Sequence, residues 1–322
     1  MRFYHLAFSA LAGQALAAPS PAASTTSTPQ NWLYSPQVDD VALNLLDRPD
    51  IDGVQALYTW KSLEPTENHY NFSKIASDYK NVVAKGKKLW VQLQDRNFDN
   101  STDPVPGYLH TPYYNNGSTP TCDGQNCTGQ DFIVTGYVAQ QWNPRVRSRF
   151  QALLKELALN FDGKITGLNL AETSIAVNGT ANNYTDEGYF LGELENAGYA
   201  ASVFKKSYAV QYVNFWPDGW NNTNNRFTDS FNYYAKHGVG VGGPDLIPNK
   251  PGQMANSYVY IPEYHNKVPI TVVAVQEPDV LNETNAATGK PFTKEEFVDF
   301  AVNDLKIDII FWTTIIPWLQ GK

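Results

Sequence analysis

Two glutamates that end apolar runs are the first residues to consider for chemistry. Glu172 ends the run ITGLNLAE, and Glu277 ends the run ITVVAVQE. A carboxylate at the end of a buried segment is costly unless the protein pairs it or uses it. Two facing carboxyl groups can cleave a glycosidic bond, because one protonates the departing oxygen while the other attacks the anomeric carbon or activates water. We expect Glu172 and Glu277 to form such a pair; the alternative is that each caps a helix or bridges a loop.

Another carboxylate could serve as the partner of Glu172. Asp245 ends the run VGVGGPD and could replace Glu277 as the partner of Glu172. Retaining enzymes hold their two carboxyl groups about 5–5.5 Å apart, and inverting enzymes hold them about 6.5–9.5 Å apart. A wider Glu172–Asp245 pair would therefore indicate inversion.

Such a pair needs a scaffold that brings distant strand ends together. Apolar runs typical of β-strands occupy eight segments, namely 31–34, 54–60, 88–96, 165–172, 209–216, 239–245, 270–277 and 307–315. Segments with helical spacing separate most of these runs. The alternation predicts parallel βαβ units and an α/β fold, a (β/α)8 TIM barrel. In such a barrel the fourth and seventh strand ends, with Glu172 and Glu277, face each other across the mouth.

Few residues follow the last run, so we expect the eighth helix to be shortened or missing. A doubly wound open sheet is the alternative fold, although no Gly-x-Gly-x-x-Gly follows the first strand.

The two strand-end glutamates resemble those of clan A of the glycoside hydrolases, which are (β/α)8 enzymes. The resemblance implies that Glu172 is the acid/base after strand four and that Glu277 is the nucleophile after strand seven. The stretch WKSLEPTENHYNF is similar to the W-x-x-L-E-P-x-x-G-x-Y-D-F stretch of several clan A families. The sequence departs from the clan at Ala171, where an asparagine usually precedes the acid/base. No particular family within the clan is indicated.

Other polar and aromatic residues near the strand ends are candidates for substrate contacts. Gln94 and Arg96 alternate onto one strand face and could hydrogen-bond hydroxyl groups; an internal salt bridge is the alternative for Arg96. Trp216 and Trp220 could form a stacking wall, although core packing would equally account for Trp216. Trp312 resembles the clan's sugar platform after strand eight. The full set of expected substrate-binding residues is Gln94, Arg96, Asn169, Trp216, Trp220, Asp245 and Trp312.

The N-terminal residues predict export. Residues 1–17 have the pattern of a signal peptide, with a small-x-small cleavage site at Ala15–Ala17. Residues 18–30 are rich in Ser, Thr and Pro and predict a solvated linker, and residues 31–322 predict a single catalytic domain. Asn-x-Ser/Thr sequons, which mark candidate N-glycosylation sites, occur at Asn71, Asn100, Asn116, Asn126, Asn178, Asn183, Asn221 and Asn282.

The cysteines agree with export. The chain has two, Cys122 and Cys127, in the stretch CDGQNC. In an exported protein a small disulfide loop is favoured over free thiols.

Composition limits the partners. The formal net charge of −8 argues against nucleic acid or an anionic membrane as a partner. Aromatic residues make up 13% of the chain, which suits a protein that stacks on sugar rings, or one with a large aromatic core. The 5 histidines lack metal-ligand spacing, so we expect neither metal nor cofactor. We expect a secreted monomer whose partner is a carbohydrate.

These observations predict a retaining glycoside hydrolase that acts on a polysaccharide or oligosaccharide. The alternative from another class is a secreted carbohydrate-binding protein that has lost turnover, which Ala171 and the missing eighth helix would favour. A barrel hydrolase with a non-sugar substrate is a third reading, because the fold does not fix the function.

Overall fold

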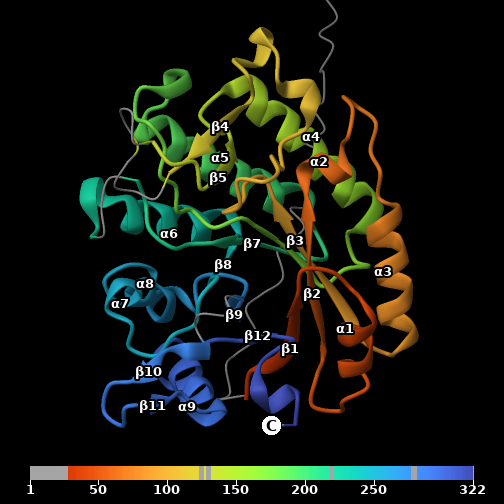
Figure 1. Ribbon diagram of the computed structural model, residues 1–322, viewed down its shortest axis with the longest axis vertical. Coiled ribbons are helices and arrows are strands. Elements are labelled where there is room, and N and C mark those ends of the chain that lie inside the picture. Colours follow the sequence, from red (N-terminus) through yellow and green to blue (C-terminus); the bar gives the residue numbers. More distant parts are fainter. Residues whose placement is uncertain (1–27, 123–126, 128–131, 218–220, 277–280, 322) are drawn as a thin grey trace, which may run out of the picture.

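The fold is a closed barrel of eight parallel strands, as the sequence predicts (Figure 1). The computed structural model describes residues 28–122, 127, 132–217, 221–276 and 281–321. Around the barrel the order is β1-β12-β9-β8-β7-β6-β3-β2. Each strand falls within or overlaps one predicted run: β1 (Gln30–Ser35), β2 (Gly53–Thr59), β3 (Lys88–Gln94), β6 (Gly167–Leu170), β7 (Tyr208–Tyr212), β8 (Gly240–Gly243), β9 (Thr271–Val275) and β12 (Ile309–Thr313).

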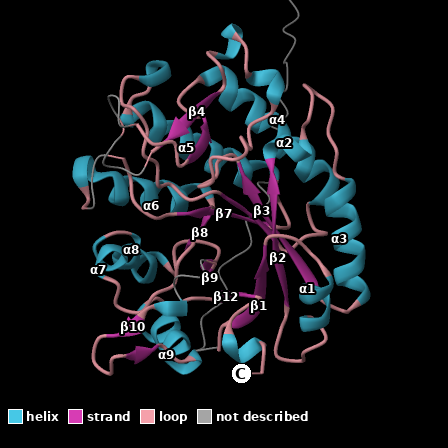
Figure 2. Ribbon diagram, in the orientation of Figure 1, coloured by secondary structure: helices cyan, strands magenta, loops and turns pink. Residues whose placement is uncertain are grey.

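Helices surround the barrel on its outer side (Figure 2). They are α1 (Asp40–Leu45), α2 (Trp60–Leu63), α3 (Ser73–Ala84), α4 (Pro144–Phe161), α5 (Asp186–Val203), α6 (Arg226–His237), α7 (Pro251–Ala255), α8 (Ser257–Tyr264) and α9 (Lys294–Asp299). Asn143 caps α4 by accepting a hydrogen bond from the Arg145 amide, and a capping box joins Thr293 to Glu296 at the start of α9. After β12, the part of the chain that the structure describes contains only the 3-10 turn Pro317–Leu319, as expected for a shortened eighth helix.

The lower interior of the barrel is filled by indole rings beside glycines. Trp32 on β1 lies in register with Gly53 on β2, and Trp90 on β3 lies in register with Gly167 on β6. A Cβ atom at Gly53 or Gly167 would come within 2.5 Å of the neighbouring indole. The alternation of large and absent side chains therefore lets the rings fill the barrel without strain.

The long segment between β3 and α4 forms a second small sheet above the barrel. Strands β4 (Ser118–Thr121) and β5 (Gly136–Ala139) pair antiparallel, and Figure 1 shows them close to α5. The disulfide Cys122–Cys127 follows β4, which confirms the predicted pairing. A further short hairpin joins β10 (Thr284–Asn285) to β11 (Lys290–Pro291) before α9. Within the described residues, no helix combines the length and apolar character that a bilayer crossing needs.

Candidate active site

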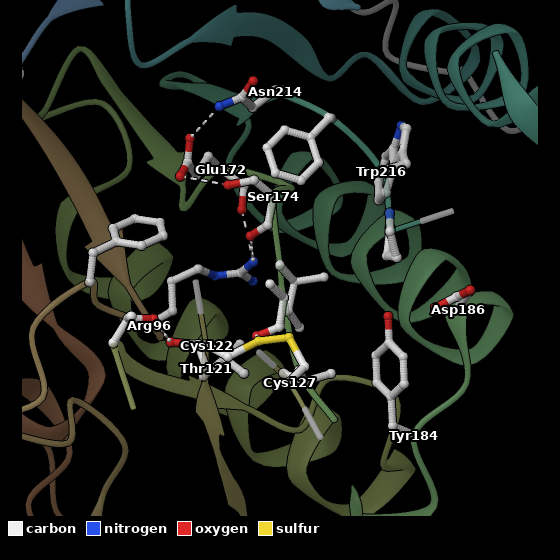
Figure 3. A pocket seen from close by; sticks show the side chains of 18 of the residues that line it. Arg96, Thr121, Cys122, Cys127, Glu172, Ser174, Tyr184, Asp186, Asn214 and Trp216 are labelled. Atoms are coloured by element: carbon white, nitrogen blue, oxygen red, sulfur yellow. Dashed lines mark hydrogen bonds between the residues drawn. A yellow bond between two sulfur atoms is a disulfide. The ribbon is translucent and has the colours of Figure 1, made fainter. Parts of the chain in front are cut away.

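A cavity of about 820 Å3 opens above the carboxyl ends of β3, β6 and β7. Active sites of (β/α)8 barrels lie at this end, where strands pass into βα loops. Figure 3 shows the side chains that project into the cavity, with Glu172 and Asn214 on one side and Tyr184 and Asp186 on the other. The lining combines polar side chains, among them Glu172, Ser174 and Asn214, with the apolar surface of Phe98, Ile175, Phe215 and the disulfide.

Glu172 is half-buried at the edge of this cavity, two residues after β6 ends. Its Oε1 atom accepts a hydrogen bond from the Ser174 hydroxyl at 2.6 Å, and its Oε2 atom accepts one from the Asn214 amide nitrogen at 3.0 Å. Asn214 follows β7, so neighbouring strand ends place donor and acceptor together. Both carboxylate oxygens are thus oriented before any substrate arrives.

The two donors differ in what they allow. The Ser174 hydroxyl can donate or accept, whereas the Asn214 amide nitrogen can only donate. Oε2 accepts from Asn214 in either protonation state of the carboxyl group, and Oε1 can carry a proton if the serine hydroxyl reverses and accepts. The arrangement allows Glu172 to gain and lose a proton without leaving its place.

A buried arginine supports the turn that carries Glu172. The Arg96 guanidinium donates to the Glu172 main-chain carbonyl at 2.8 Å and, at 2.5 Å, to the Tyr189 hydroxyl. The Tyr189 hydroxyl donates in turn to the Thr173 carbonyl at 3.0 Å. Salt bridges join Arg96 to Asp95 at 3.0 Å and to Glu193 at 2.7 Å. This group, Asp95, Arg96, Tyr189 and Glu193, is called the Arg96 cluster below.

Burial shifts the acid–base behaviour of the Arg96 cluster. Removal from water raises the pKa of Glu193 to about 7; the neighbouring Arg96 opposes this shift and Asp95 adds to it. The pKa of Tyr189 is raised well above its ordinary value by the same burial. Two carboxylates share one guanidinium here, so a proton on Glu193 relieves the excess negative charge.

Arg96, which the sequence predicts as a substrate contact, is bonded to protein groups instead. Its side chain is 3% exposed and its donors are directed to Asp95, Glu193, Tyr189 and main-chain carbonyls. The internal salt bridge, considered as the alternative, is what the structure contains. Gln94, at the end of β3, is half-buried and is not among the described residues that line the cavity.

Two of the predicted substrate contacts are buried side chains. Asn169 is fully buried in the barrel, where its Oδ1 atom accepts hydrogen bonds from Gln55 at 2.9 Å and from Trp90 at 3.1 Å. Trp312 is 1% exposed and points outward, with its ring centroid 6.1 Å from Phe297 of α9. Successive side chains of a strand point to opposite faces. Asn169 therefore points into the barrel core and Trp312 into the helix layer, so neither side chain has surface free to contact a sugar.

The aromatic wall of the cavity also differs from the prediction. Trp216 borders the cavity but is 1% exposed and packs on Phe190 at a centroid distance of 4.8 Å. Trp220 lies outside the described residues. Phe98 and Phe215 offer ring surface instead, since Phe98 is 63% exposed and Phe215 is half-buried.

Two residues, Glu277 and Asp245, were predicted as possible partners of Glu172. Glu277 lies outside the described residues, although Gln276 before it donates across the barrel to Gln92 at 3.2 Å. Asp245 follows β8 and bridges to Val275 of β9, and it is not among the described residues that line the cavity.

The described residues contain no group of three or more His, Cys, Asp or Glu side chains that could hold a metal ion. The sequon asparagines that the structure describes are exposed or half-buried, and Asn126 lies outside the described part of the chain. Residues 1–27, the predicted signal peptide and most of the linker, also lie outside it.

Sequence reasoning missed several residues of the cavity. Ser174 and Asn214 hold the Glu172 carboxylate, and Phe98, Asp186 and Phe215 face the same space. Asn214 had a usable signal, because it is a polar residue at the end of an apolar run, as Glu172 is. Phe98 and Asp186 had none, since only the folded loops bring them to the cavity.

Solved structures share this barrel. The catalytic domain of beta-amylase from Paenibacillus polymyxa matches with a TM-score of 0.60 and 9% identity, over 88% of this chain and 92% of that chain. The GH5_18 glycoside hydrolase from Streptomyces cattleya, in complex with Manb1-4GlcNAc, gives 0.54 and 14%, over 88% and 70%. The old yellow enzyme homologue from Zymomonas mobilis gives 0.51 and 10%, over 88% and 84%.

At these identities the likeness shows the fold, which proteins of different function share. No family model and no curated protein matches the sequence.

Proposed function

We propose that this protein is a secreted, N-glycosylated retaining glycoside hydrolase that cleaves O-glycosidic bonds of a polysaccharide or oligosaccharide. The observation that carries the proposal is the Glu172 carboxylate. It stands at the mouth of a (β/α)8 barrel, beside a cavity of about 820 Å3, with one oxygen on a donor that can reverse and one on a donor that cannot. A carboxyl group held in this way beside a cavity can give up a proton and take one back, as an acid/base residue must. Glycoside hydrolases among the barrels of similar fold agree with this assignment.

The proposed reaction has two steps. Glu172 gives its proton to the glycosidic oxygen while the Glu277 carboxylate attacks the anomeric carbon, so the bond to the departing alcohol breaks and a glycosyl ester forms. Water then attacks the same carbon, the Glu172 carboxylate takes its proton, and Glu277 is released. Asp245 is the alternative partner, and with it inversion becomes the expected outcome.

The walls of the cavity suit a sugar. Phe98 and Phe215 present ring surface on which the C–H face of a pyranose can pack. Phe98 is 63% exposed, so the face of its ring is open to a ligand in the cavity. Phe98 and Phe215 therefore take the stacking role that the sequence assigned to Trp216.

An extracellular location fits the features of the chain. The Cys122–Cys127 disulfide and the accessible sequon asparagines are both consistent with an oxidising, glycosylating route. Intact mass before and after enzymatic deglycosylation of the secreted protein would show which sequons carry glycan.

The test is reducing-sugar release from a panel of neutral, amino and uronic polysaccharides. The panel is run with the wild type, Glu172→Gln, Glu277→Gln and Asp245→Asn, with Glu263→Gln as the control. Glu263 lies on α8 and forms an exposed pair with Lys267, away from the cavity lining. We expect activity to fall by at least about a thousandfold in Glu172→Gln and Glu277→Gln, while Glu263→Gln stays unchanged.

Nuclear magnetic resonance of the first product anomer separates the two mechanisms. Retention supports Glu277 as the nucleophile, and inversion with loss of activity in Asp245→Asn supports the alternative pair. Activity that survives in Glu172→Gln contradicts the proposal. Binding without cleavage, unchanged by Glu172→Gln, would favour the carbohydrate-binding protein instead.

A further inference from the structure

The cavity beside Glu172 has carboxylates on two sides. Glu172 lies at one side, and Figure 3 shows Asp186 on the opposite side, next to Tyr184. Arg96 is the sole Lys, Arg or His among the described residues that line the cavity. Its charge is already balanced by Asp95 at 3.0 Å and Glu193 at 2.7 Å, and its side chain is 3% exposed. A ligand in the cavity therefore meets negative charge without a cation to pair with.

The sequence around the cavity is also poor in cations. Residues 97–142 contain no lysine or arginine. Residues 165–204 and residues 209–225 contain none either. These segments include the loops after β3, β6 and β7, at whose ends the cavity opens. Among the described residues that line the cavity, the charged side chains are Glu172, Asp186 and the already paired Arg96. Asp186, together with Glu172 when it is ionised, therefore gives the field in the cavity a negative sign.

We propose that this cavity selects glycans without anionic groups, and that Asp186 enforces the selection; this rests on the proposed function. A uronate or sulfate bound there would place a like charge beside Asp186, and no free cation among the described lining residues would compensate its lost hydration. A neutral sugar can donate hydroxyl hydrogen bonds to Asp186, and an amino sugar can pair its ammonium group with the carboxylate.

Asp186 also has a structural role that must be separated from selection. It is the first residue of α5, whose N-cap Thr185 accepts a hydrogen bond from the Gly188 amide at 3.0 Å. A carboxylate in the first turn stabilises a helix through the positive N-terminal end of its dipole. Glu187 shares that position, but it pairs with Arg226 at 3.0 Å and is not among the described cavity residues. Glu187→Gln is therefore the matched control for Asp186→Asn.

The experiment uses polysaccharides in matched pairs. Mannan, β-glucan and amylose are each tested beside the same polymer after partial oxidation of its C6 hydroxyls to carboxylates, and chitosan is added as a cationic probe. Cleavage is measured as kcat/KM, and binding is measured by affinity electrophoresis. Both are measured for the wild type, Asp186→Asn and Glu187→Gln, at about 0.01 M and about 1 M salt, where the screening lengths are about 30 Å and about 3 Å.

We expect the oxidised member of a pair to be bound and cleaved about tenfold or more less well than the native member at low salt, and the gap to shrink at high salt. Asp186→Asn should narrow the gap at least about threefold, and Glu187→Gln should leave it unchanged.

Other results separate this proposal from the proposed function. Equal cleavage of both members of a pair would overturn the selection and leave the hydrolase assignment standing. A gap that high salt does not change would indicate steric exclusion, and would also overturn the selection. Binding of native members without any cleavage would support the selection and contradict the hydrolase. If no polymer is bound or cleaved, both proposals fail.

Discussion

Arg96 and Arg149 are both paired with a buried glutamate, yet their other hydrogen bonds go to different kinds of partner. Arg96 pairs with Glu193 and donates to the main chain of the turn that carries Glu172. Arg149 on α4 pairs with Glu64, which is 0% exposed, and donates to the Asn68 side chain at 2.9 Å. The first pair holds a turn of the cavity, whereas the second holds the loop between α2 and α3.

The comparison shows why similar chemistry can mark either a site or a scaffold. The Glu64 carboxylate also accepts hydrogen bonds from the Trp60 indole at 2.9 Å and from the Asn68 main-chain N–H at 3.1 Å. These contacts lie within the stretch WKSLEPTENHYNF, so this motif stabilises a loop. Position relative to Glu172, the proposed acid/base, and not the arginine–glutamate pair itself, decides the role.

Replacing Arg96 or Arg149 by methionine should change stability and kcat to different extents. Arg96→Met leaves Asp95 and Glu193 buried without their cation, so we expect the free energy of unfolding to fall by about 3–5 kcal/mol. Since the Glu172 turn loses its support, kcat should also fall about a hundredfold. Denaturant unfolding and initial rates, corrected for the folded fraction, would measure both effects.

Arg149→Met is the matched control for that change. It should cost about 1–3 kcal/mol of unfolding free energy, because Arg149 keeps some contact with water, and it should leave kcat unchanged. If both variants lose the same share of kcat at equal folded fraction, the distinction between site and scaffold is wrong. Arg96→Lys, which keeps the charge, serves if Arg96→Met does not fold.

Glu193 makes the Arg96 cluster sensitive to pH. Its pKa is raised from an ordinary value near 4.5 to about 7, chiefly by burial, so the folded protein binds more protons than the unfolded chain between these values. The unfolding free energy should therefore fall as pH rises from about 4.5 to about 7, by on the order of 1–3 kcal/mol. Glu193→Gln should flatten this slope in denaturant unfolding, whereas Glu195→Gln, an exposed neighbour on α5, should not. A slope unchanged in Glu193→Gln would assign the pH dependence elsewhere.

Smaller effects should follow from single hydroxyl groups. Ser174→Ala removes the hydrogen bond to the Glu172 carboxylate, so kcat/KM should fall about tenfold with little loss of stability. Ser62→Ala removes a hydroxyl at α2 that donates to the Thr59 carbonyl, and it should leave kcat/KM unchanged. Equal rates in both variants would show that Ser174 does not serve Glu172.

Much of the fold could be predicted because strand periodicity and helix caps are local. The apolar runs ending at Trp60 and Glu172, and the capping box of Thr293 and Glu296, each depend on a few neighbouring residues. The direction in which a side chain near a strand end points was harder to predict. Trp312 faces the helices and Asn169 the barrel interior, which register in the closed barrel decides.

The cavity walls could not be predicted for a related reason. Phe98 and Phe215 lie in the loops after β3 and β7, and Asp186 is the first residue of α5, so their meeting depends on the course of these loops and on where α5 begins. The position of Glu172 after β6 was predictable because the end of a strand fixes it, and its role as the acid/base stays a prediction. Of the residues that hold its side chain, Asn214 shares the pattern of a polar residue at the end of an apolar run, whereas Ser174 is placed by the turn geometry.

The role of Glu172 is tested most directly by its dependence on the leaving group. Aryl glycosides whose phenols range from poor to good leaving groups are hydrolysed by the wild type and by Glu172→Gln. A good leaving group departs without protonation, so an acid/base role predicts that the variant loses most activity on poor leaving groups and far less on good ones. An equal loss across the series, or no loss, would contradict the assignment of Glu172 as the proton donor.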